Sequence, residues 1–382
     1  MQGDQISIPC VFMRGGSSRG AMFHGRDLPG DAALRDRVVL AAYGSPDPRQ
    51  VDGIGGADPL TSKVAVIDPS ARNDADVDYT FGQVSIETPE VFWVGNCGNM
   101  LSGVAAFAVD EGLVAVTEPF TRVRIFAVNV DQVVEAEVPV AGGVARTAGD
   151  AEVAGVPGVG AAIMLDFGDC AGAVTGRLLP TGAVVDKVEV SGLGDVEVSI
   201  VDASTPFVYV RASDLGVPAS ITPDAILADA MLLERLEAIR SAAAVHCGLV
   251  EDAARATELS PSIPRVTMVG DATGSADDAQ DADLLCRQMS MQRPHRTYAV
   301  TNGVCTAVAA NVPGTIVHQL ARRRGPGGLR IGHPAGIVLA DAAVVTANTA
   351  DGFKVERAAI ARTARRIMKG DLFIPAGIVD AS

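Results

Sequence analysis

The sequence has few aromatic residues, few positive charges and no long apolar runs. Only 4% of its 382 residues are Phe, Trp or Tyr, so small aliphatic side chains must form most of the core. The formal net charge of −15 argues against nucleic acid or an anionic membrane surface as a partner. No uninterrupted apolar run approaches the roughly 20 residues of a membrane-spanning helix. A globular protein is favoured, and an anionic small molecule stays open as its ligand, because a local cluster of donors can override the global charge.

The cysteines are scattered, and no two of them have the spacing of a CxxC or zinc motif. They stand at positions 10, 97, 170, 247, 286 and 305. This pattern is typical of reduced thiols in a cytosolic protein rather than of a disulfide framework, and it indicates no metal site. The N-terminal MQGDQISIPC lacks the basic and apolar segments of a signal peptide, so we expect a cytoplasmic protein.

The length favours two domains, because 382 residues exceed what one hydrophobic core ordinarily holds. Turn residues concentrate in residues 171–182, AGAVTGRLLPTG, which is the best candidate for a linker. The sequence therefore predicts one domain over residues 1–180 and a second over residues 181–382. The last residues of the second domain are free to return to the first.

Strand and helix patterns occur in both halves, as is typical of an α+β fold. In the first half, strands are expected at 8–13, 21–24, 64–67, 78–87, 91–94, 121–128, 133–138 and 161–167, and helices at 32–43 and 100–109. In the second half, strands are expected at 185–190, 196–202, 207–211, 266–269 and 297–300, and helices at 225–246 and 304–312.

Short internal matches indicate that the two halves are related. Residues 100–106, MLSGVAA, match residues 304–310, VCTAVAA, at an offset of 204. Ser17-Ser18 matches Ser204-Thr205 at an offset of 187. If the halves face each other across a pseudo-twofold axis, the N-termini of the two matching helices converge on one cleft. Such a cleft concentrates N–H donors on an anionic substrate.

A turn rich in glycine and asparagine, GNCGN, surrounds Cys97 between a predicted strand and the helix of residues 100–109. The thiol is thus expected at a helix N-terminus, where unpaired N–H groups and the helix dipole favour an anion. A cysteine at such a position is suited to proton transfer. The alternative is a buried cysteine in an ordinary turn. Under the internal match Cys97 falls on Thr301, so the two halves do not supply two thiols.

Two other segments combine glycines with polar groups. Residues 14–20, RGGSSRG, join two strands and offer N–H, hydroxyl and guanidinium donors to a carboxylate or phosphate. A glycine hairpin with solvated arginines is the alternative. Residues 52–63 form a loop that ends at Lys63, before a strand, and lack the order of glycines and lysine of a P-loop. Lys63 is either a surface charge or a partly desolvated base.

These motifs together resemble the PrpF family of isomerases, within the diaminopimelate-epimerase-like fold. The matching motifs are MRGGSSRG (13–20), DGIGGADPLTSK (52–63), NCGN (96–99), RPHRTYAVT (293–301) and GHPAG (332–336). The resemblance implies two pseudo-symmetric α+β domains, each a sheet rolled around a central helix, with the active site between them. It also implies that a proton moves along an allylic or keto–enol system of an unsaturated di- or tricarboxylate, without a cofactor.

Lys63 and Cys97 correspond to the catalytic pair of that family, and which of them takes the first proton stays open. The expected substrate-binding residues are Ser17, Ser18, Arg19, Ser62, Asn96, Gly98, Asn99, His333 and Gly336. Without the resemblance, His333 would be more typical of a histidine packed at a turn. Residues 44–63 are most similar to oxalomesaconate tautomerases, so 4-oxalomesaconate is the expected substrate.

Three other functions stay open. They are cis–trans isomerisation of 2-methylaconitate, racemisation or epimerisation of amino acids, and carboxylate binding without catalysis. An epimerase needs a second thiol opposite Cys97, and the match places Thr301 there. The presence of both Lys63 and Cys97 argues against a binding protein that has lost its chemistry. The expected partner is an anionic small molecule, and a homodimer is the expected assembly.

Overall fold

The computed structural model describes residues 3–93, 96–168, 170–190, 193–272, 281–322 and 328–380. The chain divides into two compact units. Unit 1 comprises residues 1–165 and 361–382, and unit 2 comprises residues 166–360. No helix within the described ranges is long and apolar enough to cross a membrane.

The division differs from the predicted boundary at residues 180 and 181, because the segment taken as a linker packs within unit 2. Ala171 forms a β-bridge to Ala203. The backbone N–H groups of Val174 and Thr175 both donate to one carboxylate oxygen of Asp202, over 2.9 and 2.7 Å. Residues that hold a buried carboxylate in this way belong to the unit that contains it.

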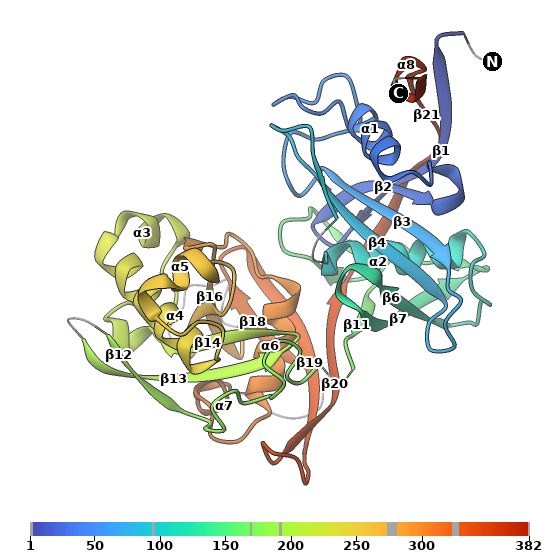
Figure 1. Ribbon diagram of the computed structural model, residues 1–382. Helices are drawn as coiled ribbons and strands as arrows, with labels where there is room; N and C mark the ends of the chain where they lie inside the picture. The colour runs from blue at the N-terminus through green and yellow to red at the C-terminus, as the bar shows by residue number, and fades with distance from the viewer. Residues whose placement is uncertain are drawn as a thin grey trace. The chain divides into compact units, whose positions relative to one another are not determined.

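Unit 1 surrounds a central helix with strands (Figure 1). Its strands are β1 (Gln5–Gly15), β2 (Ser18–His24), β3 (Lys63–Pro69), β4 (Val77–Val84), β5 (Val91–Phe92), β6 (Phe120–Ala127), β7 (Gln132–Ala141), β8 (Val144–Ala145), β9 (Ala151–Glu152), β10 (Val159–Gly160), β11 (Ile163–Asp166, which ends in unit 2) and β21 (Ala364–Pro375). Its helices are α1 (Ala32–Tyr43), α2 (Gly98–Asp110) and α8 (Gly377–Asp380), with 3-10 turns η1 (Gly25–Asp27) and η2 (Val128–Val130).

The sheet of unit 1 carries α1 on one face and α2 on the other. β1 and β2 form an antiparallel hairpin, β3 runs parallel to β2, β4 antiparallel to β3, β6 parallel to β4, and β7 antiparallel to β6. Phe23 and Val64 pack in one cluster with Val39 of α1. On the opposite face, Met22 approaches Gly103 of α2 so closely that a Cβ there would lie 2.5 Å from the Met22 Cε. Because side chains alternate between the two faces of a strand, one set of strand residues packs on α1 and the other set packs on α2.

Unit 2 is built in the same way. Its strands are β12 (Asp186–Val190), β13 (Gly194–Ala203), β14 (Thr205–Arg211), β15 (Arg265–Gly270), β16 (Leu284–Ser290), β17 (Arg293–Pro294), β18 (Leu329–His333), β19 (Gly336–Thr346) and β20 (Phe353–Arg362, whose end enters unit 1). Its helices are α3 (Pro223–Ala228), α4 (Ala230–His246), α5 (Ala256–Leu259), α6 (Val300–Ala310) and α7 (Ile316–Leu320), with 3-10 turns η3 (Ala212–Leu215) and η4 (Ala253–Arg255).

The order of strand pairing repeats between the units. β13 and β14 form an antiparallel hairpin, β15 runs parallel to β14, β16 antiparallel to β15, β18 parallel to β16, and β19 antiparallel to β18. α4 and α6 follow the same strands in unit 2 as α1 and α2 do in unit 1. The relation between the halves that the sequence indicated is therefore confirmed as a shared topology.

Three predicted elements differ from the structure. Residues 225–246 form two helices rather than one, because Asp229 accepts a hydrogen bond from the Leu232 N–H and caps α4. The strand expected at 297–300 was wrong: α6 already begins at Val300, after its N-cap. Of the strand expected at 91–94, only Val91 and Phe92 pair with β4, and Phe92 is 45% exposed. Residue 94 lies outside the described ranges.

Candidate active site

Cys97 is the N-cap residue of α2, in extended backbone conformation, and its side chain does not cap the helix. Its Sγ donates to Ser18 Oγ over 3.8 Å, and Ser18 itself is buried at the start of β2. The first turn of α2 contains no acidic residue. The thiol therefore lies at the positive end of a helix whose first N–H groups have no intrahelical acceptors.

The glycine turn between β1 and β2 packs against this end of α2. Asn99 Nδ2 donates to Ser17 Oγ over 3.1 Å. Gly16 has a φ of +51°, and a Cβ on it would lie 2.2 Å from Asn99 Oδ1. A Cβ on Gly15 would lie 2.6 Å from the Asn99 carbonyl oxygen. Only glycines allow the turn to approach the helix this closely.

Lys63 is the first residue of β3, and it is only 8% exposed. Its Nζ donates to Gln83 Oε1 over 2.7 Å and lies 5.2 Å from the centroid of the Phe81 ring. Within the described residues, no carboxylate forms an ion pair with this ammonium. A nearly buried lysine with a neutral partner fits a proton-transfer group better than a surface charge.

The strand registers place Lys63 and Cys97 on the same side of the sheet. Gly20 of β2 lies directly opposite Lys63, and side chains at directly opposite positions point to the same face. Ser18 and Met22, two residues either side of Gly20, share that face. Ser18 contacts Cys97, and Met22 packs on α2. The two predicted catalytic residues thus both lie on the α2 side.

Two residues of β4 were missed by the sequence analysis. Gln83 holds the Lys63 ammonium, and its Nε2 donates to the Ser62 carbonyl oxygen over 2.9 Å. Tyr79 has a fully buried hydroxyl without a hydrogen-bond partner in the described part of the chain. Burial raises the pKa of this hydroxyl well above its usual value, and the nearby Cys97 raises it further. The strand predicted at residues 78–87 puts both side chains on one face, because side chains alternate along a strand, but it gives no partner for them.

The remaining predicted residues of unit 1 differ in what they offer a ligand. Ser62 is fully buried, and its hydroxyl donates to Gln50 Oε1 over 2.7 Å, which ties the loop together. Arg19 Nε and Asn96 Oδ1 are buried without a hydrogen-bond partner among the residues described. Gly98 is the first residue of α2. Arg19 and Asn96 therefore have polar atoms to spare, whereas the Ser62 hydroxyl is already engaged.

His333 and Gly336 belong to unit 2, whereas all the other predicted site residues belong to unit 1. His333 ends β18, is buried, and stacks on Tyr298 with ring centroids 5.8 Å apart. Its Nδ1 accepts from the Ala335 N–H over 3.3 Å. Gly336 lies opposite His333 with a φ of +134°, a conformation that favours glycine. The GHPAG motif is thus a tight turn that fixes the imidazole.

Known structures share this fold. The crystal structure of methylitaconate-delta-isomerase has a TM-score of 0.90 and 46% sequence identity, and the match covers 99% of this chain and 98% of that one. A hydroxyproline epimerase from Agrobacterium vitis has a TM-score of 0.53 at 11% identity, and the match covers 97% of this chain and 92% of that one. The fold is therefore that of the racemases and epimerases.

Comparison with known sequences shows the family to which the chain belongs. The chain is 48% identical to the 3-methylitaconate isomerase of Eubacterium barkeri, and the match covers 97% of this chain and 98% of the relative. It is 41% identical to the (4E)-oxalomesaconate Delta-isomerase of Novosphingobium sp. (strain KA1), with 96% and 98% covered. The protein is an isomerase. It belongs to the PrpF family, whose match spans residues 5–375.

Proposed function

We propose that the protein moves a proton along an allylic or keto–enol system of a small unsaturated di- or tricarboxylate, with Lys63 and Cys97 as the proton-transfer groups. The observation that carries the proposal is their common place on the α2 side of the sheet. Among the described residues, Lys63 has only a neutral amide as its side-chain hydrogen-bond partner, and Cys97 is at the N-terminal end of α2. Such a reaction needs one group that removes a proton and a second that returns one at the far carbon.

The two groups exchange roles with the direction of the reaction. An amine or a thiolate accepts the proton from the carbon next to the double bond, and the electron pair of that C–H bond shifts into the allylic system. The other group, as a thiol or an ammonium, then donates a proton to the far carbon. One proton leaves, one arrives, and the double bond moves without any net oxidation or reduction.

The negative charge that develops on the substrate needs donors close by. The first N–H groups of α2 and the turn of residues 14–20 are the groups available for it in unit 1. Ser17, Ser18 and Arg19 act there as carboxylate-binding groups together with Asn96, Gly98 and Asn99. In unit 2, His333 and Gly336 are further candidates for carboxylate binding. Because the Ser62 hydroxyl donates to Gln50, we assign it to loop structure rather than to direct contact with substrate.

Two substrates are proposed. Residues 44–63 favour 4-oxalomesaconate, and the similarity to a relative named (4E)-oxalomesaconate Delta-isomerase supports it. The second candidate is 3-methylitaconate, which the more similar of the two named relatives supports. Both are small unsaturated acids with more than one carboxylate, so the same proton-transfer pair serves either.

Incubation of the purified protein with each acid in D₂O, followed by proton NMR, tests the proposal. We expect the double bond to move and deuterium to enter the allylic carbon of one of the two acids. The ratio of kcat/KM values then identifies the substrate. A protein that binds the acids but neither isomerises them nor exchanges their protons would be a carboxylate-binding protein, and the proposed reaction would be wrong.

A further inference from the structure

Arg362 is a buried cation that the proposed chemistry has not used. It is the last residue of β20 and is only 4% exposed. Its Nε donates to Asn99 Oδ1 over 3.0 Å, and its Nη1 donates to the Ala361 carbonyl oxygen over 2.8 Å. Both acceptors are neutral. Within the described ranges, no Asp or Glu forms an ion pair with this guanidinium.

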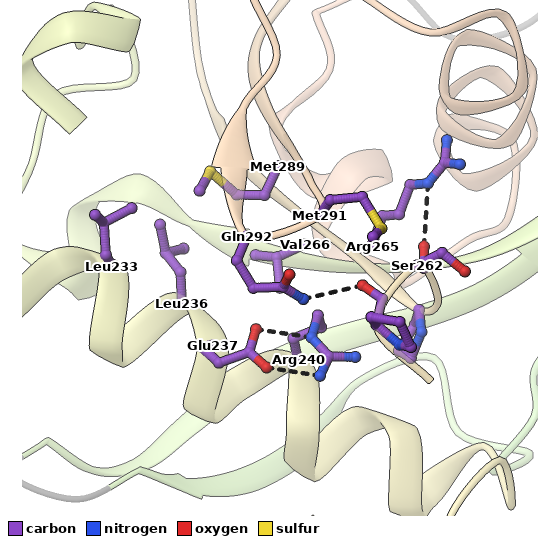
Figure 2. A pocket seen from close by; sticks show the side chains of 12 residues that line it. Leu233, Leu236, Glu237, Arg240, Ser262, Arg265, Val266, Met289, Met291 and Gln292 are labelled. Carbon is purple, nitrogen blue, oxygen red and sulfur yellow. Dashed lines mark hydrogen bonds and ion pairs between the residues drawn. The ribbon is translucent and has the colours of Figure 1, made fainter. Parts of the chain in front are cut away.

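A second arginine of the molecule is buried to the same extent and has its charge balanced. Arg240 of α4 is also 4% exposed. Its Nε and Nη2 donate to the two carboxylate oxygens of Glu237 over 2.8 and 2.6 Å, and Figure 2 shows this pair in the wall of a pocket. A buried charge ordinarily requires such a partner, because the loss of hydration is otherwise uncompensated. Arg362 is buried to the same extent, but no carboxylate within the described ranges balances its charge.

The surroundings of Arg362 also favour an anion. Asn99, which holds its Nε, is in the first turn of α2, where the helix dipole is positive. Burial lowers the pKa of Arg362 to about 10, and the nearby Cys97 acts in the opposite direction. The guanidinium is therefore still charged at neutral pH. The Tyr79 hydroxyl, also near Cys97, is a buried donor with no acceptor in the described part of the chain.

We propose that Arg362 binds a carboxylate group of the substrate at the N-terminus of α2, beside Cys97, and that Asn99 positions its guanidinium. The planar fork of an arginine matches a carboxylate, and the first N–H groups of α2 add donors to the same anion. The class of ligand rests on the proposed function. The sequence analysis missed this residue because 263 positions separate Arg362 from Asn99.

Binding of an unreactive acid tests the proposal without any turnover. Calorimetry would compare methylsuccinate, a saturated dicarboxylate, with 2-methylbutanoate, its counterpart with one carboxylate. We expect the wild type to bind methylsuccinate more tightly than 2-methylbutanoate. Arg362→Ala should weaken methylsuccinate binding about 10- to 100-fold, as expected for loss of a hydrogen-bonded charge pair, and should reduce the preference for the dicarboxylate.

Arg362→Lys and Arg240→Lys form a matched pair, since each keeps a positive charge and loses the fork. Arg362→Lys should weaken methylsuccinate binding at least several-fold with little change in melting temperature. Arg240→Lys should lower the melting temperature and leave binding unchanged. If Arg362→Ala does not fold, Arg362→Lys decides. Wild-type affinity for methylsuccinate in either folded Arg362 variant would overturn the proposal, as would a wild type that does not bind this acid.

The same experiment separates this proposal from the proposed reaction. Affinity for methylsuccinate that depends on Arg362, in a protein that isomerises neither candidate acid, would leave the carboxylate site standing and remove the proton transfer. Turnover that survives Arg362→Ala with an unchanged KM would support the proton transfer and rule out the carboxylate site at Arg362.

Discussion

The N-termini of α2 and α6 are equivalent in topology, but their surroundings differ. Around α6, buried polar groups satisfy one another. Asn302 Nδ2 donates to Thr267 Oγ1 over 3.0 Å, and the hydroxyls of Tyr298 and Tyr209 lie 2.8 and 3.1 Å from Thr306 Oγ1. Such a closed network fixes the packing of the helix and has few groups left for a ligand.

Around α2, more of the buried polar groups lack a hydrogen-bond or ion-pair partner among the described residues. The Tyr79 hydroxyl and Asn96 Oδ1 have no partner among the described residues, and Arg362 has no carboxylate. Near α6 there are exceptions too. Gln288 Oε1 accepts from the Ala299 N–H, but its Nε2 has no partner in the described ranges, and Asp202 Oδ1, near Cys305 of α6, has none there either. The difference supports the proposal of a site at the N-terminus of α2 in unit 1, with the equivalent end of α6 serving mainly as structure.

The position of Lys63 sharpens the comparison. Gly20 of β2 lies opposite Lys63 of β3. The offset of 187 between the halves makes Phe207 of β14 the counterpart of Gly20, and Phe207 lies opposite Arg265 of β15. Arg265 Nε donates to the Ser262 carbonyl oxygen, as Figure 2 shows. A guanidinium does not act as a base near neutral pH. The repeat therefore supplies one candidate amine base, in unit 1.

The largest effects are expected at the catalytic pair itself. Lys63→Ala and Cys97→Ser should each lower kcat about 10²- to 10⁴-fold, because each removes a group that transfers a proton. Steady-state kinetics on the acid identified by NMR would measure this loss. Thr301→Ser and Arg265→Lys are the matched controls in unit 2, and they should change kcat less than about twofold. Near-normal turnover in both unit 1 variants would contradict the assignment.

A smaller effect is expected when the partner of Lys63 becomes charged. Gln83→Glu would place a carboxylate next to the ammonium and favour its charged form, so kcat at neutral pH should fall about 10-fold. Steady-state kinetics of the folded variant at neutral pH would measure this fall.

Gln83→Met is the control for this change, since it removes the hydrogen bond without adding charge. It should lower kcat less than Gln83→Glu does. The role of Lys63 as a base would be disproved by a folded Gln83→Glu variant that keeps the wild-type kcat.

The smallest effects are expected in stability, and they should differ between the two units. Tyr298→Phe should lower the free energy of unfolding by about 1 kcal/mol, because it removes one hydrogen bond of Thr306 Oγ1 from a buried network. Tyr79→Phe should leave the free energy of unfolding within about 0.5 kcal/mol of the wild type, because its hydroxyl has no partner in the described chain. Urea denaturation of both variants measures the difference. Equal destabilisation of the two would show that the Tyr79 hydroxyl is satisfied within the protein.

Local patterns in the sequence predicted most of the elements. The helix of residues 32–43 was predicted with the bounds that it has, because Asp31 caps its start and Gly44, with a φ of +68°, ends it. The GNCGN turn placed Cys97 at a helix N-terminus for the same kind of local reason.

Partners that come from distant strands could not be predicted. Gln83 meets Lys63 only through the register of β3 and β4, and Arg362 meets Asn99 only through the return of the chain to unit 1. The error at residues 297–300 has the same origin. The Ala299 N–H donates to the Gln288 side chain rather than to a neighbouring strand, so the β-branched and aromatic residues there are not part of the sheet.

The pairing of β21 with β1 has a consequence for folding of the chain during its synthesis on the ribosome. β1 is synthesised before unit 2, and its partner over Gln5–Gly15 is translated only after all of unit 2. Unit 2 is contiguous in sequence, so it can complete its sheet while one edge of β1 is still unpaired. A nascent chain in this state exposes an unpaired strand edge, which is the kind of surface that chaperones shield. The segment that finally covers this edge follows directly after Arg362.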